Sequence, residues 1–151
     1  MRTNLALGIY LVAGAVEIWL GAMYFSSKQF MSYHGEAVGS SWQEVDAGVQ
    51  TLILGLMKLA GGAWIALGFF TVALVLIALK TRSVVARWTL PVVTLVSFSA
   101  SFAATWGVYR ATGASTPWAP SLAMIGFALV ALVVDSPWSK AGAFSKSKVE
   151  A

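Results

Sequence analysis

The sequence predicts an all-α integral membrane protein, a four-helix bundle with the N- and C-termini in the cytoplasm. Three observations lead to this fold class. Only 11% of the 151 residues are charged and 58% are hydrophobic, whereas soluble domains are about 25% charged. The apolar residues form four long runs, and the basic residues gather between these runs on one side. Such a chain cannot cover its surface with polar groups, so we expect lipid to be its solvent.

Four transmembrane helices are expected in a single domain of residues 1–151, because a helix needs about 20 apolar residues to cross the hydrocarbon layer. The expected spans are residues 5–25, 49–79, 88–109 and 118–134. An outer loop, 26–48, separates the first two spans, and a cytoplasmic tail, 136–151, follows the last. In the outer loop, Ser41 followed by Glu44 resembles a capping box, which predicts a short helix before the second span.

The orientation follows from the distribution of lysine and arginine. The side that holds both termini carries Arg2, Lys80, Arg82, Arg87, Lys140, Lys146 and Lys148, and the other side carries Lys28 and Arg110. Basic residues are enriched in cytoplasmic loops. The sequence therefore predicts a multi-pass protein of the cell membrane with both termini in the cytoplasm.

Glu17 and Lys58 are the two ionisable residues within the expected spans. A charge at membrane depth costs about 2.5–3.5 kcal/mol on insertion scales. Counted from Phe25 and from Val49, the two residues lie at similar depths, about 12 and 13 Å below the outer surface. Neither residue has an opposite charge on its own helix, so we expect an intramembrane ion pair between them. One alternative is a functional site, either a proton or cation relay or a polar site for a ligand headgroup. The other is that Glu17 is protonated and Lys58 extends towards the headgroups.

Polar residues elsewhere suggest two further sites. Hydroxyl side chains form one stripe on the third span, at Thr94, Ser97, Ser101 and Thr105. Such hydroxyls usually tighten helix packing, and a polar lining of a pathway is the alternative. The outer loop gathers His34, Glu36, Glu44 and Asp46, which have the chemistry to hold a divalent metal but lack a recognised ligand spacing. Gly55, Gly61 and Gly62 on the second span are expected close-packing positions.

Several function classes are excluded by composition. The chain has no cysteine, so thiol chemistry and thiolate metal centres are absent. Its single histidine excludes bis-histidine haem within one chain. No block of like charges indicates nucleic-acid binding, and no cofactor is predicted. The expected partners are membrane lipids and, because four short helices bury little surface, further copies of the chain or a larger membrane complex.

Two resemblances to known families rest on short stretches. Residues 10–17, YLVAGAVE, look like the region of small multidrug-resistance exporters that holds their membrane carboxylate, which would be Glu17 here. The chain departs from that family in its length, its long outer loop and Lys58. Residues 33–36, 50–62 and 110–118 look like segments of small uncharacterised bacterial four-helix membrane proteins. In size and number of spans the chain is also similar to DoxX-like proteins.

The function expected from these observations is that of a non-enzymatic integral membrane component. It would be an accessory subunit of a membrane complex or a binder of an apolar or lipid-like ligand. A small proton- or cation-coupled transporter that uses Glu17 is the first alternative. A metal-dependent enzyme at the outer face is the second.

Overall fold

The computed structural model describes residues 2–138, and every element in that range is helical. The elements are α1 (Arg2–Ser26), α2 (Ser32–Val38), the 3₁₀ helix η1 (Trp42–Glu44), α3 (Ala47–Thr81), α4 (Val84–Thr112) and α5 (Trp118–Asp135). The helices α1, α3, α4 and α5 correspond to the four expected spans, and each is long and apolar enough to cross a membrane. The expected all-α fold is confirmed for this part of the chain. Lys140, Lys146 and Lys148 lie outside the described residues.

The helix ends are set by short polar signals in the sequence. The carboxylate of Asp46 accepts hydrogen bonds from the backbone N–H groups of Gly48 and Val49 and so caps α3. The hydroxyl of Ser83 caps α4 in the same way. α4 ends at Thr112 and is followed by Gly113, whose φ of 73° is a conformation that favours glycine. The predicted capping box is confirmed, because the N–H of Ser41 donates to the Glu44 carboxylate at the start of η1.

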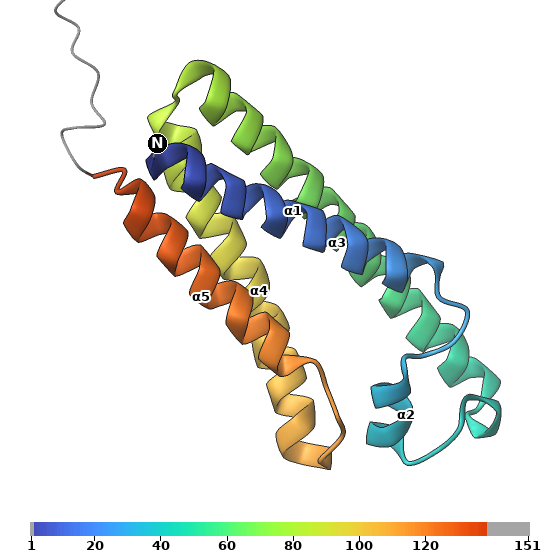
Figure 1. The fold of residues 1–151 in the computed structure, drawn as a ribbon. Coiled ribbons are helices and arrows are strands. Elements are labelled where there is room, and N and C mark those ends of the chain that lie inside the picture. The colour runs from blue at the N-terminus through green and yellow to red at the C-terminus, as the bar shows by residue number, and fades with distance from the viewer. Residues whose placement is uncertain (1, 139–151) are drawn as a thin grey trace, which may run out of the picture.

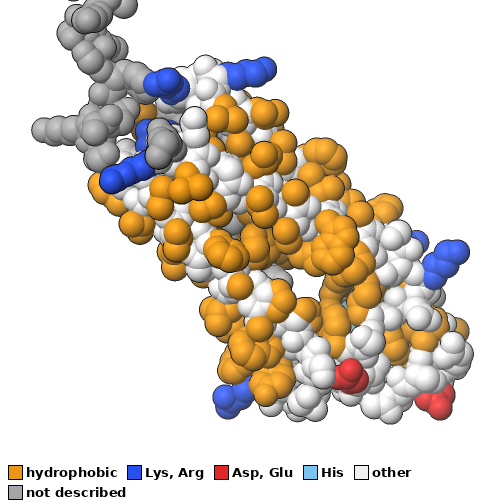
Figure 2. Space-filling model, in the orientation of Figure 1, with side chains coloured by type: hydrophobic (Ala, Val, Ile, Leu, Met, Phe, Trp, Pro, Cys, Tyr) orange, Lys and Arg blue, Asp and Glu red, His pale blue; other side chains and the backbone are white. Residues whose placement is uncertain are grey.

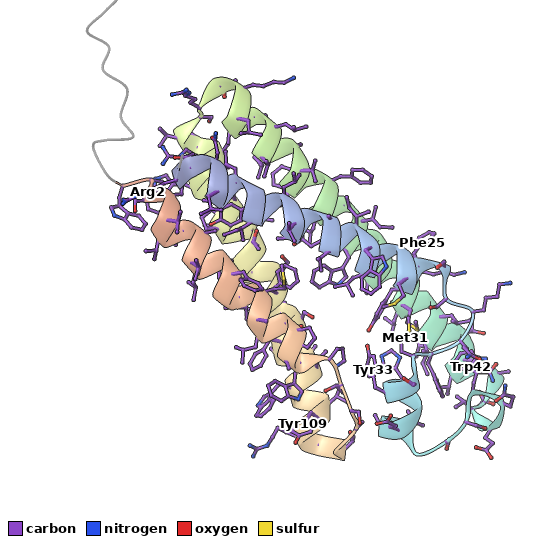
Figure 3. All side chains as sticks on the ribbon, in the orientation of Figure 1. Arg2, Phe25, Met31, Tyr33, Trp42 and Tyr109 are labelled. Carbon is purple, nitrogen blue, oxygen red and sulfur yellow. The ribbon has the colours of Figure 1, made fainter. Side chains whose placement is uncertain are left out.

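The four long helices form a ring in which α1 lies between α3 and α5, and α4 contacts both α3 and α5. One end of the bundle holds Arg2, the α3–α4 turn and the end of α5, and we call it the terminal end (Figures 1 and 3). The opposite end, the loop end, holds residues 27–46 and the α4–α5 connection, with Trp42 and Tyr109 (Figure 3). Towards the loop end the pair α1–α3 diverges from the pair α4–α5 (Figure 1).

The hydrophobic core lies in the half of the bundle next to the terminal end. Its buried members are small or aliphatic except for one tyrosine: Ala6, Leu7, Tyr10, Leu74, Val75, Ala78, Ala86, Leu90, Ala128 and Ala131. Every one of them belongs to the part of its helix nearest that end. The Tyr10 hydroxyl donates to the Ala128 carbonyl at 3.3 Å and joins α1 to α5. The four helices are therefore held together mainly at one end.

A buried salt bridge completes the terminal end. Arg87 Nε lies 2.8 Å from Asp135 Oδ2, and Arg87 Nη2 donates to Asp135 Oδ1 at 2.9 Å and to the Asp135 carbonyl at 3.0 Å. This fork-shaped contact joins the first turn of α4 to the last residue of α5. The expected third span begins at residue 88, which places Arg87 in the preceding loop, and the sequence predicts no role for Asp135. In the structure α4 begins at Val84, so Arg87 lies within the bundle.

Candidate functional site

Glu17 is the one carboxylate buried near the middle of α1. Its exposed fraction is 0%. Thr71 Oγ1 on α3 donates to Glu17 Oε2 at 3.0 Å, and Ser97 Oγ on α4 donates to Glu17 Oε1 at 2.8 Å. Both oxygens thus have neutral hydroxyl partners, and Glu17 forms no salt bridge with any described residue. The structure supplies hydrogen bonds to this group from two other helices and no counter-charge.

The expected ion pair between Glu17 and Lys58 is wrong. The register of α1 against α3 is fixed by two glycine contacts: a Cβ added to Gly21 would lie 2.6 Å from the Gly61 carbonyl oxygen, and one added to Gly68 would lie 2.6 Å from that of Gly14. Lys58 is three residues from Gly61 towards the loop end, and Glu17 is four residues from Gly21 in the opposite direction. The two residues are therefore separated by about 10 Å along the helix axis.

The length of α3 explains the error in depth. The expected depth of Lys58 is measured from Val49, on the assumption that the membrane begins there. However, α3 has 35 residues and is about 50 Å long, whereas the hydrocarbon layer is about 30 Å thick. Part of α3 therefore extends beyond the hydrocarbon layer, and Lys58 lies less deep below the outer surface than the distance from Val49 suggests. Its side chain is exposed and has no partner among residues 2–138, as the snorkelling alternative requires.

A cavity of about 470 Å³ lies between the diverging helix pairs in the half of the bundle next to the loop end. Its wall is mostly aromatic, methionine and proline side chains from all four long helices and from the outer loop. Figure 2 shows a hollow at this place, bordered by hydrophobic side chains. The volume is in the range of pockets that hold small organic ligands. The sequence analysis did not predict this cavity.

The hydroxyl stripe of α4 extends from Glu17 to the cavity. Ser97 bonds Glu17, and one turn further on Ser101 and then Thr105 line the cavity. Thr94 lies one turn in the other direction, and its buried hydroxyl has no hydrogen-bond partner among the described residues. Some residues of the stripe therefore tighten helix packing, and others form a polar lining. Ser101 and Thr105 line a space, whereas Ser97 joins two helices.

The outer loop covers the loop end of the cavity. Met31 and Tyr33, at the start of α2, lie on the side of the loop that faces the bundle and contribute to the cavity wall (Figure 3). The hydroxyl groups of Tyr33 and Tyr24 are hydrogen-bonded to each other and join α2 to α1. Glu36 accepts a hydrogen bond of 2.7 Å from the backbone N–H of Ser115. The loop is therefore tied to both helix pairs.

The structure does not gather the four residues of the expected metal site, and no cluster of three metal-binding side chains occurs within residues 2–138. Each acidic residue has a local structural role instead: Glu36 bonds Ser115, and Glu44 and Asp46 cap helices. His34 Nδ1 accepts from the Met31 N–H at 3.3 Å, and its ring packs against those of Tyr24, Tyr33 and Phe30. Burial lowers the pKa of His34 below its usual 6.5.

Besides the hydroxyl stripe, the position of one tryptophan, Trp64, is the only sequence feature that sets this region apart. Most tryptophans of the chain lie near helix ends, as expected for residues at a membrane surface. Trp64 instead occupies the middle of α3, where it lines the cavity and packs against Phe98 with ring centroids 5.5 Å apart. Whether such a ring fills a core or borders a cavity depends on how far the helix pairs diverge, and a single sequence does not contain that information.

Fold and site together define a protein of four membrane-length helices that surround a cavity and a buried carboxyl group. Comparison with protein-family models, curated proteins and solved structures gave no match.

Proposed function

We propose that the chain is a multi-pass protein of the cell (inner) membrane of a bacterium, with the terminal end in the cytoplasm. The composition of α1, α3, α4 and α5 supports membrane insertion. Among residues 2–138, Arg2, Lys80, Arg82 and Arg87 belong to the terminal end, Lys28 and Arg110 belong to the loop end, and Lys58 lies within α3 on the loop side. This distribution supports the orientation, since cytoplasmic segments are richer in lysine and arginine. The likeness to DoxX-like and other small bacterial four-helix proteins is part of the same proposal.

Within that membrane we infer a non-enzymatic role, the binding of an apolar or lipid-like ligand. The observation that carries this inference is the cavity of about 470 Å³ between the helix pairs. A mostly apolar wall with a few hydroxyl groups is typical of a site that binds a small organic molecule. A binder of this kind can act alone or as an accessory subunit. The many large apolar side chains exposed on the outside of the bundle offer room for copies of the chain or for a larger complex.

Purification in a mild detergent, followed by mass spectrometry of co-purified lipids, tests ligand binding. The wild type is expected to retain a lipid-like molecule near one per chain. Ser101→Phe places a ring in the cavity and should abolish retention. Ala100→Phe adds the same ring at the neighbouring exposed position and should leave retention unchanged. A wild type that retains nothing, or equal retention by both variants, would refute the proposal.

A proton- or cation-coupled transporter that uses Glu17 is the second candidate. It is favoured by a buried carboxyl group that lacks a counter-charge among the described residues and is joined through Ser97 to the hydroxyl stripe of the cavity. In proteoliposomes, a pH gradient should drive accumulation of the cargo identified by the purification above. Glu17→Gln should abolish the response to the gradient and leave cargo binding intact. Uptake by the wild type that responds neither to the pH gradient nor to a sodium or potassium gradient would exclude this candidate.

A further inference from the structure

The polar groups of the cavity wall are all uncharged. None of the described residues that line it is Asp, Glu, Lys, Arg or His. Glu17 is close in sequence to the lining residues Val16 and Leu20, but it is fully buried and contributes no surface to the wall. A ligand that carried a net charge would lose its hydration in this space and find no counter-charge, at a cost of several kcal/mol. The wall therefore favours a neutral ligand.

In the arrangement that makes both hydrogen bonds of Ser121, the hydroxyl groups at the α4–α5 side of the wall use their own hydrogens within the protein and can still accept. Ser101 Oγ and Ser121 Oγ are 3.0 Å apart, and Ser121 Oγ lies 3.3 Å from the Pro117 carbonyl oxygen. When Ser101 donates to Ser121 and Ser121 donates to that carbonyl, both hydroxyl hydrogens are used. The hydrogen of Thr105 is also used, because Thr105 donates to the Ser101 carbonyl at 2.8 Å. The oxygen lone pairs remain for a ligand that donates.

The cavity is open at the side of the bundle between α1 and α5. Trp19 on α1 and Pro120 on α5 both line the cavity and are exposed, and the exposed fraction of Trp19 is 64%. Trp19 lies two residues beyond Glu17 towards the loop end, within the apolar part of α1. In the proposed orientation this opening faces the hydrocarbon of the outer leaflet. A ligand dissolved in the membrane can reach the cavity through it without crossing water.

We propose that the cavity receives a neutral amphiphile with a hydrogen-bond-donating head, a membrane alcohol, which enters between α1 and α5 and places its hydroxyl group against Ser101 and Ser121. The inference rests on the proposed ligand-binding function and adds the chemical class of the ligand. The alcohol donates to a serine oxygen, and its apolar body lies against Trp64 and Phe98. A methyl ether of the same body accepts hydrogen bonds but donates none. A quaternary ammonium of the same body is charged.

Three photoreactive probes with one diazirine-bearing C16 chain and different heads test this class: an alcohol, its methyl ether and its trimethylammonium analogue. The protein is used in nanodiscs, the labelled residues are mapped by mass spectrometry, and affinities are measured by competition with the matching unlabelled compounds. The alcohol is expected to label cavity residues. The ether should bind about three- to tenfold more weakly, the effect of one hydrogen bond. The ammonium probe should label the cavity least.

The double variant Ser101→Ala with Ser121→Ala should remove the preference for the alcohol over the ether and leave ether binding unchanged. Ser99→Ala, on an exposed position of the same helix, is the matched control and should keep the preference. If alcohol and ether bind the wild type equally, or the ammonium probe binds best, the cavity still binds apolar ligands but the proposed class is wrong. If no probe labels the cavity, both the class and the proposed function fail.

Discussion

At the scale of single residues, the main lesson concerns how a buried carboxyl group is satisfied. The sequence identified Glu17 as an unusual residue correctly, because a carboxylate within an apolar run needs an explanation. It did not identify the partners, because Thr71 and Ser97 are uncharged and lie 54 and 80 residues away along the chain. An opposite charge is the partner that the sequence suggests, and Lys58 is the only one within the expected spans. Hydroxyl groups on neighbouring helices satisfy the same need without a second charge.

The contacts of Glu17 predict that its charge contributes little to folding. A neutral carboxyl group fits the site, because Ser97 Oγ lies within 2.8 Å of Glu17 Oε1 and 2.9 Å of the Val93 carbonyl and can relay a hydrogen between them. Glu17→Gln should therefore change the free energy of unfolding by less than about 1 kcal/mol, whereas Glu17→Leu should cost about 1–3 kcal/mol because it leaves Thr71 without a partner. Thermal unfolding in detergent measures both.

Lys58 provides the matching test. Lys58→Met should be nearly neutral, and its effect should add to that of Glu17→Gln, because residues without shared partners do not couple. If each single variant lost much stability and the double variant regained it, the result would support an ion pair between Glu17 and Lys58.

His34 predicts a pH dependence at the loop end. Burial lowers its pKa below 6.5 in the folded protein, so the unfolded loop binds a proton more readily than the folded one. The folded packing of α2 should therefore be at full stability above about pH 6.5 and should weaken as the pH falls from there towards the lower folded pKa. Amide hydrogen exchange of residues 32–38 between pH 7.5 and 5.5 measures this, after correction for intrinsic exchange rates. His34→Asn should show no such change; an unchanged profile in the wild type would contradict the prediction.

At the scale of helices, small residues decide which element packs on which. The sequence predicted close packing at Gly55, Gly61 and Gly62, and the structure confirms only Gly61. A Cβ on Gly55 or Gly62 would meet no atom within 4 Å, whereas one on Gly61 would lie 2.6 Å from the Phe25 backbone nitrogen. Several faces of α3 carry small residues, so composition alone did not indicate which one meets α1. Helix bounds were predicted well because apolar runs and caps are local features.

The glycine contacts predict a large difference between two alanine variants. At Gly21 a Cβ would lie 2.6 Å from the Gly61 carbonyl oxygen and 2.7 Å from the Ile65 backbone nitrogen. Because a clash with backbone atoms cannot be relieved by side-chain rotation, Gly21→Ala should lower the free energy of unfolding by about 1–3 kcal/mol. Gly62→Ala, in open space, should be neutral or stabilising by up to about 1 kcal/mol, the gain in helix propensity. Unfolding in a denaturing detergent compares them, and equal effects would contradict the α1–α3 register.

The Arg87–Asp135 salt bridge joins α4 to α5 and predicts a strongly coupled pair. Removal of one partner leaves a buried charge, so Arg87→Met and Asp135→Leu should each cost about 3–5 kcal/mol. The double variant should be far less destabilised than the sum of the two, and a thermodynamic cycle in detergent measures the coupling. Simple additivity would mean that the contact contributes no specific stability.

At the scale of the whole molecule, the number and order of the long helices were the features that the sequence predicted most completely. Apolar length is a sum over about 20 residues and tolerates local exceptions, so the four helices were found despite Glu17 and Lys58. The divergence of the helix pairs depends on contacts between distant segments, and the cavity that results from it was not predicted. Sequence reasoning therefore located the carboxyl group of the candidate site and part of its hydroxyl stripe, but not the space beside them.

The proposed orientation can be measured with two single-cysteine variants of this cysteine-free chain. Ser40→Cys lies in the outer loop, and Thr81→Cys is exposed at the end of α3. In intact spheroplasts, a membrane-impermeant maleimide should label the first and not the second, and both should react after permeabilisation. Labelling of both variants from the same side would refute the four-span topology.

The uneven distribution of the core determines how the cavity can change its size. The Arg87–Asp135 salt bridge, the Tyr10–Ala128 hydrogen bond and the buried cluster all lie in the half next to the terminal end, so a rotation of the two helix pairs about that end would leave these contacts in place and would strain the Glu36–Ser115 hydrogen bond at the loop end. A rotation of only about 5° at the terminal end would move helix ends about 30 Å away by roughly 2.5 Å, a distance set by the helical rise. A rotation of the pair α1–α3 relative to the pair α4–α5 by this amount would widen or narrow the opening between α1 and α5 without unpacking the core.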